Sequence, residues 1–183
     1  MFDYSKVVCV TNRKLVHGDF LEKIEQICNL GVKSIILREK DLPPEEYLNL
    51  TKEVFKISKN YNVPLFAHNS FEGGEITGNI HLSYDKYINN LDKAQNYEKV
   101  GVSVHSINEI VELKVLPDYF LVGHIFQTDC KKDLKPRGLG FLEEICKKSP
   151  VPVYGIGGIN ESNYKSVLDT GADACAIMSG LMK

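Results

Sequence analysis

The residues best suited to chemistry in this sequence lie in two glycine-containing turns near its C-terminal end. The first turn contains Gly157 and Gly158, and the second contains Met178, Ser179 and Gly180. Backbone N–H groups can gather around a phosphate only where side chains leave room, and a following helix N-terminus adds partial positive charge. The two turns therefore predict a phosphate-binding site formed by Gly157, Gly158, Met178 and Ser179, although the glycines could also serve only to make tight turns.

A second group of candidates is the charged triplet Arg38, Glu39 and Lys40, which ends an apolar run. Side chains alternate along a strand, so Arg38 and Lys40 would share one side and Glu39 would face the other. Two neighbouring cations are suited to binding a carboxylate or a phosphate. The alternative is a solvent-exposed ion pair with no role in binding.

His124 is the candidate for proton transfer. It lies at the start of the longest loop in the sequence, from Gly123 to Gly138, and a loop of this length in a short chain is typical of a binding loop or lid. Imidazole exchanges protons near neutral pH without a metal, but a structural histidine is the alternative. Cys130 lies in the same loop, without a neighbour in the sequence that would activate its thiol.

These candidates follow short apolar runs, which alternate with segments of helical periodicity. The runs are almost continuously apolar, as expected for parallel strands buried on both faces. Residues 20–30 have apolar positions at helical spacing, with Asp19 suited to cap the helix and Gly31 to end it. Further helices are predicted over residues 44–60, 106–116 and 160–170. The eight runs begin near Val7, Ser34, Pro64, Asn79, Val100, Tyr119, Pro152 and Ala174.

Eight strands alternating with helices predict a compact (β/α)8 TIM barrel of the α/β class, with residues 1–183 as a single domain. An open doubly wound sheet is the alternative, but no early GxGxxG segment follows the first apolar run. The glycine-rich residues 70–78 and the few residues after 178 leave little room for helices. The third and eighth helical segments are therefore expected to be short.

The composition is that of an ordinary globular protein and excludes several classes of partner. The net charge of −2 gives no basic field to attract nucleic acid, and the first apolar run is too short to span a membrane. The five cysteines form no CxxC pair, which favours reduced thiols in a cytoplasmic protein. We expect a small phosphorylated substrate as the partner, and self-association is left open.

Several motifs give the sequence a resemblance to a known family. They are LREKD (37–41), GVSVHS (101–106), YGIGGI (154–159) and AIMSG (176–180), in this order along the whole chain. Together they resemble the thiamine phosphate synthase superfamily. That superfamily includes the synthase, which joins a pyrimidine pyrophosphate to a thiazole phosphate with Mg²⁺, and the TenI-type thiazole tautomerase, which needs no metal.

The sequence departs from the synthase pattern where that pattern supplies metal ligands. His68 and Asn69 stand where the synthase has Asn-Asp, and Lys86 stands where it has a second carboxylate, although Asp85 is one residue away. Mg²⁺ prefers carboxylate oxygens. Other departures are Ile36 for a glutamine, Gly123-His124 for Gly-Pro, and Cys130 for the second threonine of a pyrophosphate loop.

The resemblance of GHIFQTDCKK to the TenI-type signature leads to the prediction of a thiazole tautomerase, an isomerase without a cofactor. His124 would move the protons that aromatise a carboxy-dihydrothiazolylidene ethyl phosphate, and Arg38 and Lys40 would hold the carboxylate. The alternatives are an Mg²⁺-dependent synthase and a non-catalytic protein that binds a thiazole phosphate. The resemblance adds Ser103, Thr128 and Lys131 to the predicted substrate-binding residues.

Overall fold

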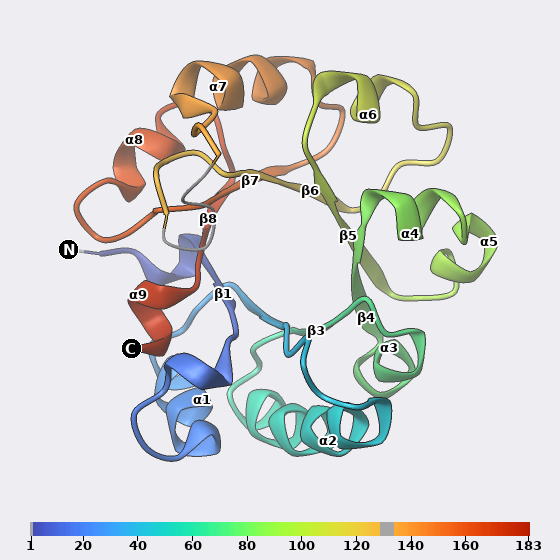
Figure 1. Cartoon of the computed structure of the whole chain (residues 1–183), viewed down its shortest axis with the longest axis vertical. Coiled ribbons are helices and arrows are strands. Elements are labelled where there is room, and N and C mark those ends of the chain that lie inside the picture. Colours follow the sequence, from blue (N-terminus) through green and yellow to red (C-terminus); the bar gives the residue numbers. More distant parts are fainter. Residues whose placement is uncertain (1, 129–133) are drawn as a thin grey trace.

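Eight parallel strands form a closed barrel in the computed structural model, which describes residues 2–128 and 134–183 (Figure 1). Each strand pairs with its neighbours in sequence, and β8 closes the ring by pairing with β1. The predicted (β/α)8 barrel is therefore confirmed. The strands are β1 (Val7–Val10), β2 (Ser34–Leu37), β3 (Leu65–His68), β4 (Asn79–Ser83), β5 (Lys99–Val104), β6 (Tyr119–Gly123), β7 (Val153–Ile156) and β8 (Ala174–Ile177).

Helices surround the barrel in the gaps between strands (Figure 1). The third and last helices have seven and four residues, so the prediction that these segments are short is confirmed. Two 3₁₀ turns flank β1, at Tyr4–Lys6 and Arg13–Leu15. The α-helices are α1 (Phe20–Asn29), α2 (Pro44–Asn60), α3 (Phe71–Thr77), α4 (Tyr84–Ile88), α5 (Leu91–Ala94), α6 (Ile107–Val111), α7 (Gly138–Lys148), α8 (Tyr164–Leu168) and α9 (Ser179–Met182).

Two predicted helices are much shorter than the sequence indicated. The helix predicted over residues 106–116 is only α6, because Ile110 is its one buried residue and little apolar contact stabilises further turns. The helix predicted over 160–170 is reduced to α8. Here the Asn160 side chain accepts a hydrogen bond from the Ser162 amide, and this local turn replaces the first helical turn.

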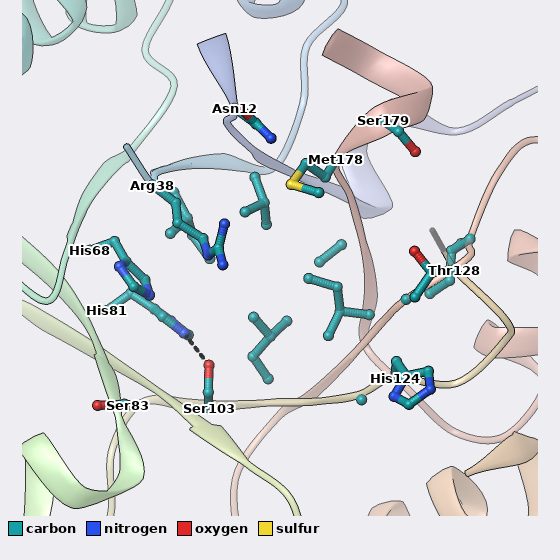
Figure 2. A pocket seen from close by; sticks show the side chains of 18 of the residues that line it. Asn12, Arg38, His68, His81, Ser83, Ser103, His124, Thr128, Met178 and Ser179 are labelled. Atoms are coloured by element: carbon teal, nitrogen blue, oxygen red, sulfur yellow. Dashed lines mark hydrogen bonds between the residues drawn. The ribbon is translucent and has the colours of Figure 1, made fainter. Parts of the chain in front are cut away.

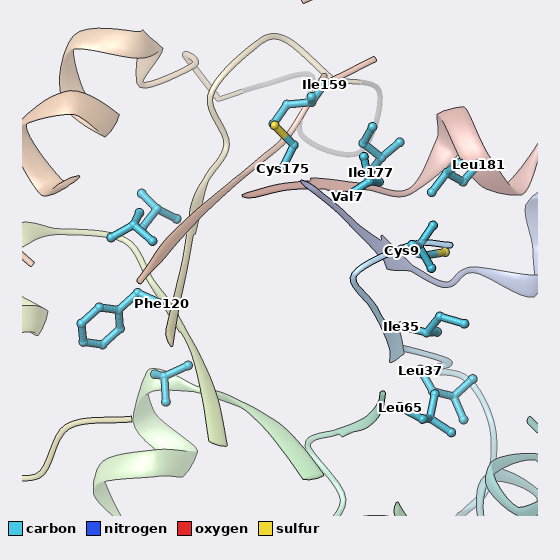
Figure 3. Packing of buried hydrophobic residues seen from close by; sticks show 14 of the residues in the cluster. Val7, Cys9, Ile35, Leu37, Leu65, Phe120, Ile159, Cys175, Ile177 and Leu181 are labelled. Atoms are coloured by element: carbon cyan, nitrogen blue, oxygen red, sulfur yellow. The ribbon is translucent and has the colours of Figure 1, made fainter. Parts of the chain in front are cut away.

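The strands bury both of their faces, and alternate residues form two separate apolar layers. The inward residues, which include Val8, Val10 and Ile36, form a small cluster inside the barrel. The outward residues, which include Val7 and Cys9, belong to the large core between strands and helices (Figure 3). The inner cluster fills the barrel toward the amino ends of the strands and leaves the carboxyl end available for a site. No helix in the described part of the chain is long and apolar enough to cross a membrane.

Candidate functional site

A cavity of about 340 Å³ opens at the carboxyl ends of the strands. All eight strands, or the residues that directly follow them, contribute to its wall. This is the end at which (β/α)8 barrels carry their active sites, and the volume is in the range of small-molecule pockets. Every predicted site residue in the described part of the chain lines this cavity: Arg38, Lys40, Ser103, His124, Thr128, Gly157, Gly158, Met178 and Ser179.

The turn after β7 requires glycine at both of its central positions. Gly157 and Gly158 have φ angles of 108° and 65°. A Cβ atom on Gly157 would lie 2.4 Å from the Cβ of His124, and one on Gly158 would lie 2.4 Å from the carbonyl oxygen of Gln127. The backbone therefore packs directly against the segment that follows β6, and larger residues would push the two loops apart.

The hydrogen bonds of this turn also fix the direction of its amides. The Ile125 amide donates to the Ile156 carbonyl at 2.9 Å, and the Phe126 amide donates to the Gly157 carbonyl at 3.0 Å. In a trans peptide the N–H points opposite to the C=O. The amides of Gly157 and Gly158 therefore point away from the 125–126 segment, and both glycines line the cavity.

The charged triplet after β2 divides its side chains between two environments. Arg38 and Lys40 line the cavity, and the Arg38 guanidinium points toward its centre (Figure 2). Glu39 is buried on the other side, where it accepts hydrogen bonds from the Thr11 hydroxyl at 2.6 Å and from the Arg13 amide. The Thr11 hydroxyl in turn accepts from the Arg38 amide at 2.9 Å. The buried carboxylate thus anchors the backbone that carries Arg38.

The wall formed by β3, β4 and β5 carries two histidines and a serine. His68 and His81 stack with ring centroids 6.0 Å apart, and His81 Nε2 lies 2.8 Å from Ser103 Oγ (Figure 2). Burial lowers the pKa of His81 to about 3. Burial, with a further contribution from His81 and the nearby cations, lowers the pKa of His68 to about 2. Both imidazoles are therefore neutral at physiological pH.

His124 is buried in the wall on the β6 side, next to the Gly157 turn. Its Nε2 donates to the Leu134 carbonyl, with 3.2 Å between the two atoms, because a carbonyl oxygen can only accept. Thr128 lies in the same region of the cavity (Figure 2). The predicted substrate-binding residue Lys131, and Cys130, lie outside the described residues.

The residues at the synthase's metal-ligand positions do not fit a divalent cation. His68 is neutral and half-buried beside cations, and the Lys86 ammonium donates to the Asn69 carbonyl at 2.5 Å. Asp85 is exposed on α4 and does not line the cavity. Among residues 2–128 and 134–183, no Asp or Glu belongs to the cavity wall and no cluster of metal-binding side chains occurs. The charge of the described wall is positive, which suits an anion rather than Mg²⁺.

The described cysteines are free thiols and lie away from the cavity. Cys9, Cys28 and Cys175 are buried in the outer core. Burial raises the pKa of Cys28 to about 11 and that of Cys175 to about 12, so both stay protonated near neutral pH. Their role is packing.

The fold and the site together define a (β/α)8-barrel protein whose cavity, at the carboxyl end of its strands, has a wall that carries Arg38 and Lys40 and no carboxylate among the described residues. The chain belongs to the thiamine monophosphate synthase family, whose TMP-TENI model matches residues 7–181. The predicted membership of the thiamine phosphate synthase superfamily is therefore confirmed.

Individual relatives agree with this assignment. The chain is 34% identical to a thiamine-phosphate synthase of Clostridium novyi, over 97% of this chain and 91% of the relative. It is 31% identical to a thiamine-phosphate synthase of Clostridium botulinum, over 94% and 88% of the two chains. Among solved structures, a thiamine phosphate pyrophosphorylase from Pyrococcus furiosus aligns with a TM-score of 0.83 at 26% identity, covering 98% of this chain and 88% of the other.

These relatives show that the predicted thiazole tautomerase is wrong, and with it the class of isomerase. The names of the similar proteins are those of the synthase, a transferase, which was the stated alternative. The prediction failed because it relied on a few strand-end residues, chiefly His124 and the missing metal carboxylates. The Leu134 carbonyl and the Gly157 turn provide a packing reason for a histidine at position 124.

Sequence reasoning missed two residues of the site. His81 lies inside the barrel and contacts both Ser103 and Tyr119. Thr11 links Glu39 to the Arg38 backbone. The signal for His81 was its inward position within the alternation of NIHLS, where a polar residue inside a barrel needs partners.

Proposed function

We propose that this chain is a transferase that forms thiamine phosphate from a pyrimidine pyrophosphate and a thiazole phosphate. In the reaction, the C–O bond to pyrophosphate breaks and pyrophosphate leaves with the electron pair. The lone pair of the thiazole nitrogen then forms the new C–N bond, and the ring takes on the positive charge. The proposal rests on the naming of relatives that are similar over almost the whole chain.

The observation that carries the proposal is that one cavity is lined by two separate groups of residues suited to binding anions. Arg38 and Lys40 form one region after β2, and the amides of Gly157 and Gly158 form the other after β7. The strands β1 and β8 lie between them in the barrel order. A reaction between two substrates that each carry a phosphate group needs two such regions within reach of one space.

We assign the leaving pyrophosphate to Arg38 and Lys40, because charge develops on it as the C–O bond breaks and a guanidinium binds two oxygens at once. The thiazole phosphate is assigned to the turn at Gly157 and Gly158, with Ser179 beside it. Thr128 and the loop residue Lys131 are expected to contact the substrates. Holding both substrates at their phosphates aligns the reacting carbon and nitrogen before the bond forms.

No step is assigned to a metal ion, since the described wall lacks suitable ligands. Neutralisation of the leaving group is attributed instead to the side chains of Arg38 and Lys40.

An assay with both substrates tests the proposal. Purified protein is incubated with the pyrimidine pyrophosphate and the thiazole phosphate, and both thiamine phosphate and pyrophosphate are quantified. We expect the two products in equal amounts. Binding of both substrates without turnover would contradict the proposal and favour the non-catalytic alternative.

A further inference from the structure

Three hydrogen-bonded side chains lead along the inside of the barrel from its inner apolar cluster to the wall of the cavity. The Tyr119 hydroxyl lies 2.9 Å from His81 Nδ1, and His81 Nε2 lies 2.8 Å from Ser103 Oγ. His81 and Ser103 line the cavity, whereas Tyr119 belongs to the inner apolar cluster. The three residues come from the adjacent strands β4, β5 and β6.

The strand register and aromatic packing hold the chain in place. His81, Gly101 and Tyr119 are aligned across β4, β5 and β6. A Cβ atom on Gly101 would lie 2.1 Å from Tyr119 Cζ, so only glycine leaves room for the phenol ring at this level. Tyr154 stacks on the same ring with centroids 4.5 Å apart, and Phe66 meets it edge-on at 5.5 Å. Tyr119 therefore has little freedom to move its hydroxyl.

The partners of Tyr119 decide which nitrogen of His81 carries the proton. A neutral imidazole has one donor and one acceptor nitrogen. Tyr119 is buried, and His81 is the hydrogen-bond partner of its hydroxyl among the described residues. If His81 Nδ1 were the donor, the hydroxyl proton of Tyr119 would be buried without an acceptor, which is costly. Tyr119 therefore donates to Nδ1, and Nε2 carries the proton.

The direction of these hydrogen bonds determines whether the Ser103 hydroxyl can donate a hydrogen bond to a substrate. His81 Nε2–H donates to Ser103 Oγ, so the serine hydroxyl is the acceptor in this hydrogen bond. Its own proton is then directed away from His81, and Ser103 lies on the cavity wall across from Met178 (Figure 2). A serine without this partner could rotate its proton toward the imidazole instead.

We infer that Tyr119 and His81 act as positioning residues that make Ser103 a hydrogen-bond donor to an acceptor atom of the bound substrates. The functional part of this inference rests on the proposed transferase activity. The tautomer of His81 does not, because it is a property of the protein without ligand.

The tautomer is tested first, by NMR of ligand-free protein labelled with ¹⁵N in its histidines. His81→Gln identifies the His81 signals by their loss. We expect a protonated Nε2 and an unprotonated Nδ1 in the wild type, and a mixture of tautomers in Tyr119→Phe. A protonated Nδ1 in the wild type would overturn the inference, as would a single unchanged tautomer in Tyr119→Phe. Neither outcome bears on whether the protein is a transferase.

The functional arm uses Tyr119→Phe with Tyr154→Phe as the matched control. Tyr154 stacks on Tyr119 in the same cluster, but the two ring nitrogens of His81 bond to Tyr119 and Ser103 and not to Tyr154, and Tyr154 does not line the cavity. We expect kcat/KM to fall about three- to tenfold in Tyr119→Phe, the effect of one hydrogen bond, and less than about twofold in Tyr154→Phe. Equal losses in the two variants would indicate general packing damage and contradict the inference.

A double-mutant cycle separates positioning from structure. If Tyr119 acts through Ser103, then Tyr119→Phe changes kcat/KM by less than about twofold in a Ser103→Ala background. An undiminished loss in that background would show that Tyr119 acts by another route. Thermal unfolding of each variant identifies any that fail to fold, and the tautomer of His81 in the wild type then stands as the test.

Discussion

Arg38 and Glu39 are neighbours in sequence, yet their side chains have opposite surroundings. The guanidinium of Arg38 faces the cavity, while the carboxylate of Glu39 is buried against Thr11 and Arg13. Because Glu39 is engaged by Thr11 and Arg13, its negative charge is not turned into the cavity beside the guanidinium. Sequence alternation alone predicted this division of side chains.

Replacement of Arg38 by methionine is expected to weaken pyrophosphate binding by about tenfold or more, since charge-assisted hydrogen bonds are lost. Isothermal titration with inorganic pyrophosphate measures the dissociation constant. Lys14→Met is the matched control, because Lys14 pairs with Asp41 outside the cavity wall. A similar loss in both variants would contradict a specific role for Arg38 and point to net charge alone.

Chelation of divalent cations is expected to leave pyrophosphate binding nearly unchanged. The described wall presents Arg38 and Lys40 and no carboxylate, so the protein itself supplies the positive charge. The dissociation constant, measured with excess EDTA and with excess Mg²⁺, should differ by less than about threefold. Pyrophosphate binding that occurs only with Mg²⁺ would show that the positive charge of Arg38 and Lys40 is not sufficient for binding.

The sequence predicted correctly the cavity residues whose place follows from their own position at a strand end. The glycines of the β7 turn, Arg38 and Lys40 all line the cavity, because strand ends and side-chain alternation can be read from one sequence. The contact of His81 with Tyr119 and Ser103 depends on the register between three strands. The apolar runs locate each strand, but they do not give which residues of neighbouring strands lie side by side.

At the scale of elements, the side chain of Thr11 connects the carboxyl ends of β1 and β2 through hydrogen bonds. Its hydroxyl donates to Glu39 and accepts from the Arg38 amide, so one side chain connects the two strand ends. Strand positions were well predicted, because each buried strand is a continuous apolar run. Helices α6 and α8 were overestimated, because their lengths depend on local turns and on how much surface they bury.

Thr11→Val keeps the shape of the side chain but leaves the Arg38 amide and Glu39 without this partner. We expect a loss of about 1–3 kcal/mol in the free energy of unfolding, with weaker pyrophosphate binding because the Arg38 backbone is loosened. Thr51→Val is the control, since Thr51 is equally buried and bonds only within α2. Denaturant unfolding and titration measure the two effects. Unchanged anion binding in Thr11→Val would show that the Thr11 bond does not position Arg38.

At the scale of the whole molecule, folding into the barrel lowers the pKa of two histidines. In mildly acidic solution these histidines are neutral in the folded state and protonated in the unfolded state. Burial lowers the pKa of His81 to about 3 and is the main cause that lowers the pKa of His68 to about 2. Unfolded histidine has a pKa of about 6.5. Between these values the unfolded state binds more protons than the native state, so stability is complete above about pH 6.5 and falls as the pH is lowered.

The two histidines together are expected to reduce the free energy of unfolding by about 2 kcal/mol between about pH 7 and about pH 5.5. Denaturant unfolding across this range measures the slope. His68→Leu should remove about half of the histidine contribution, because one proton-binding difference is lost. His17→Gln is the control, since His17 is exposed and its environment changes little on unfolding. A pH slope that stays the same in His68→Leu would mean that His68 is protonated equally in both states, against the burial that the barrel imposes on it.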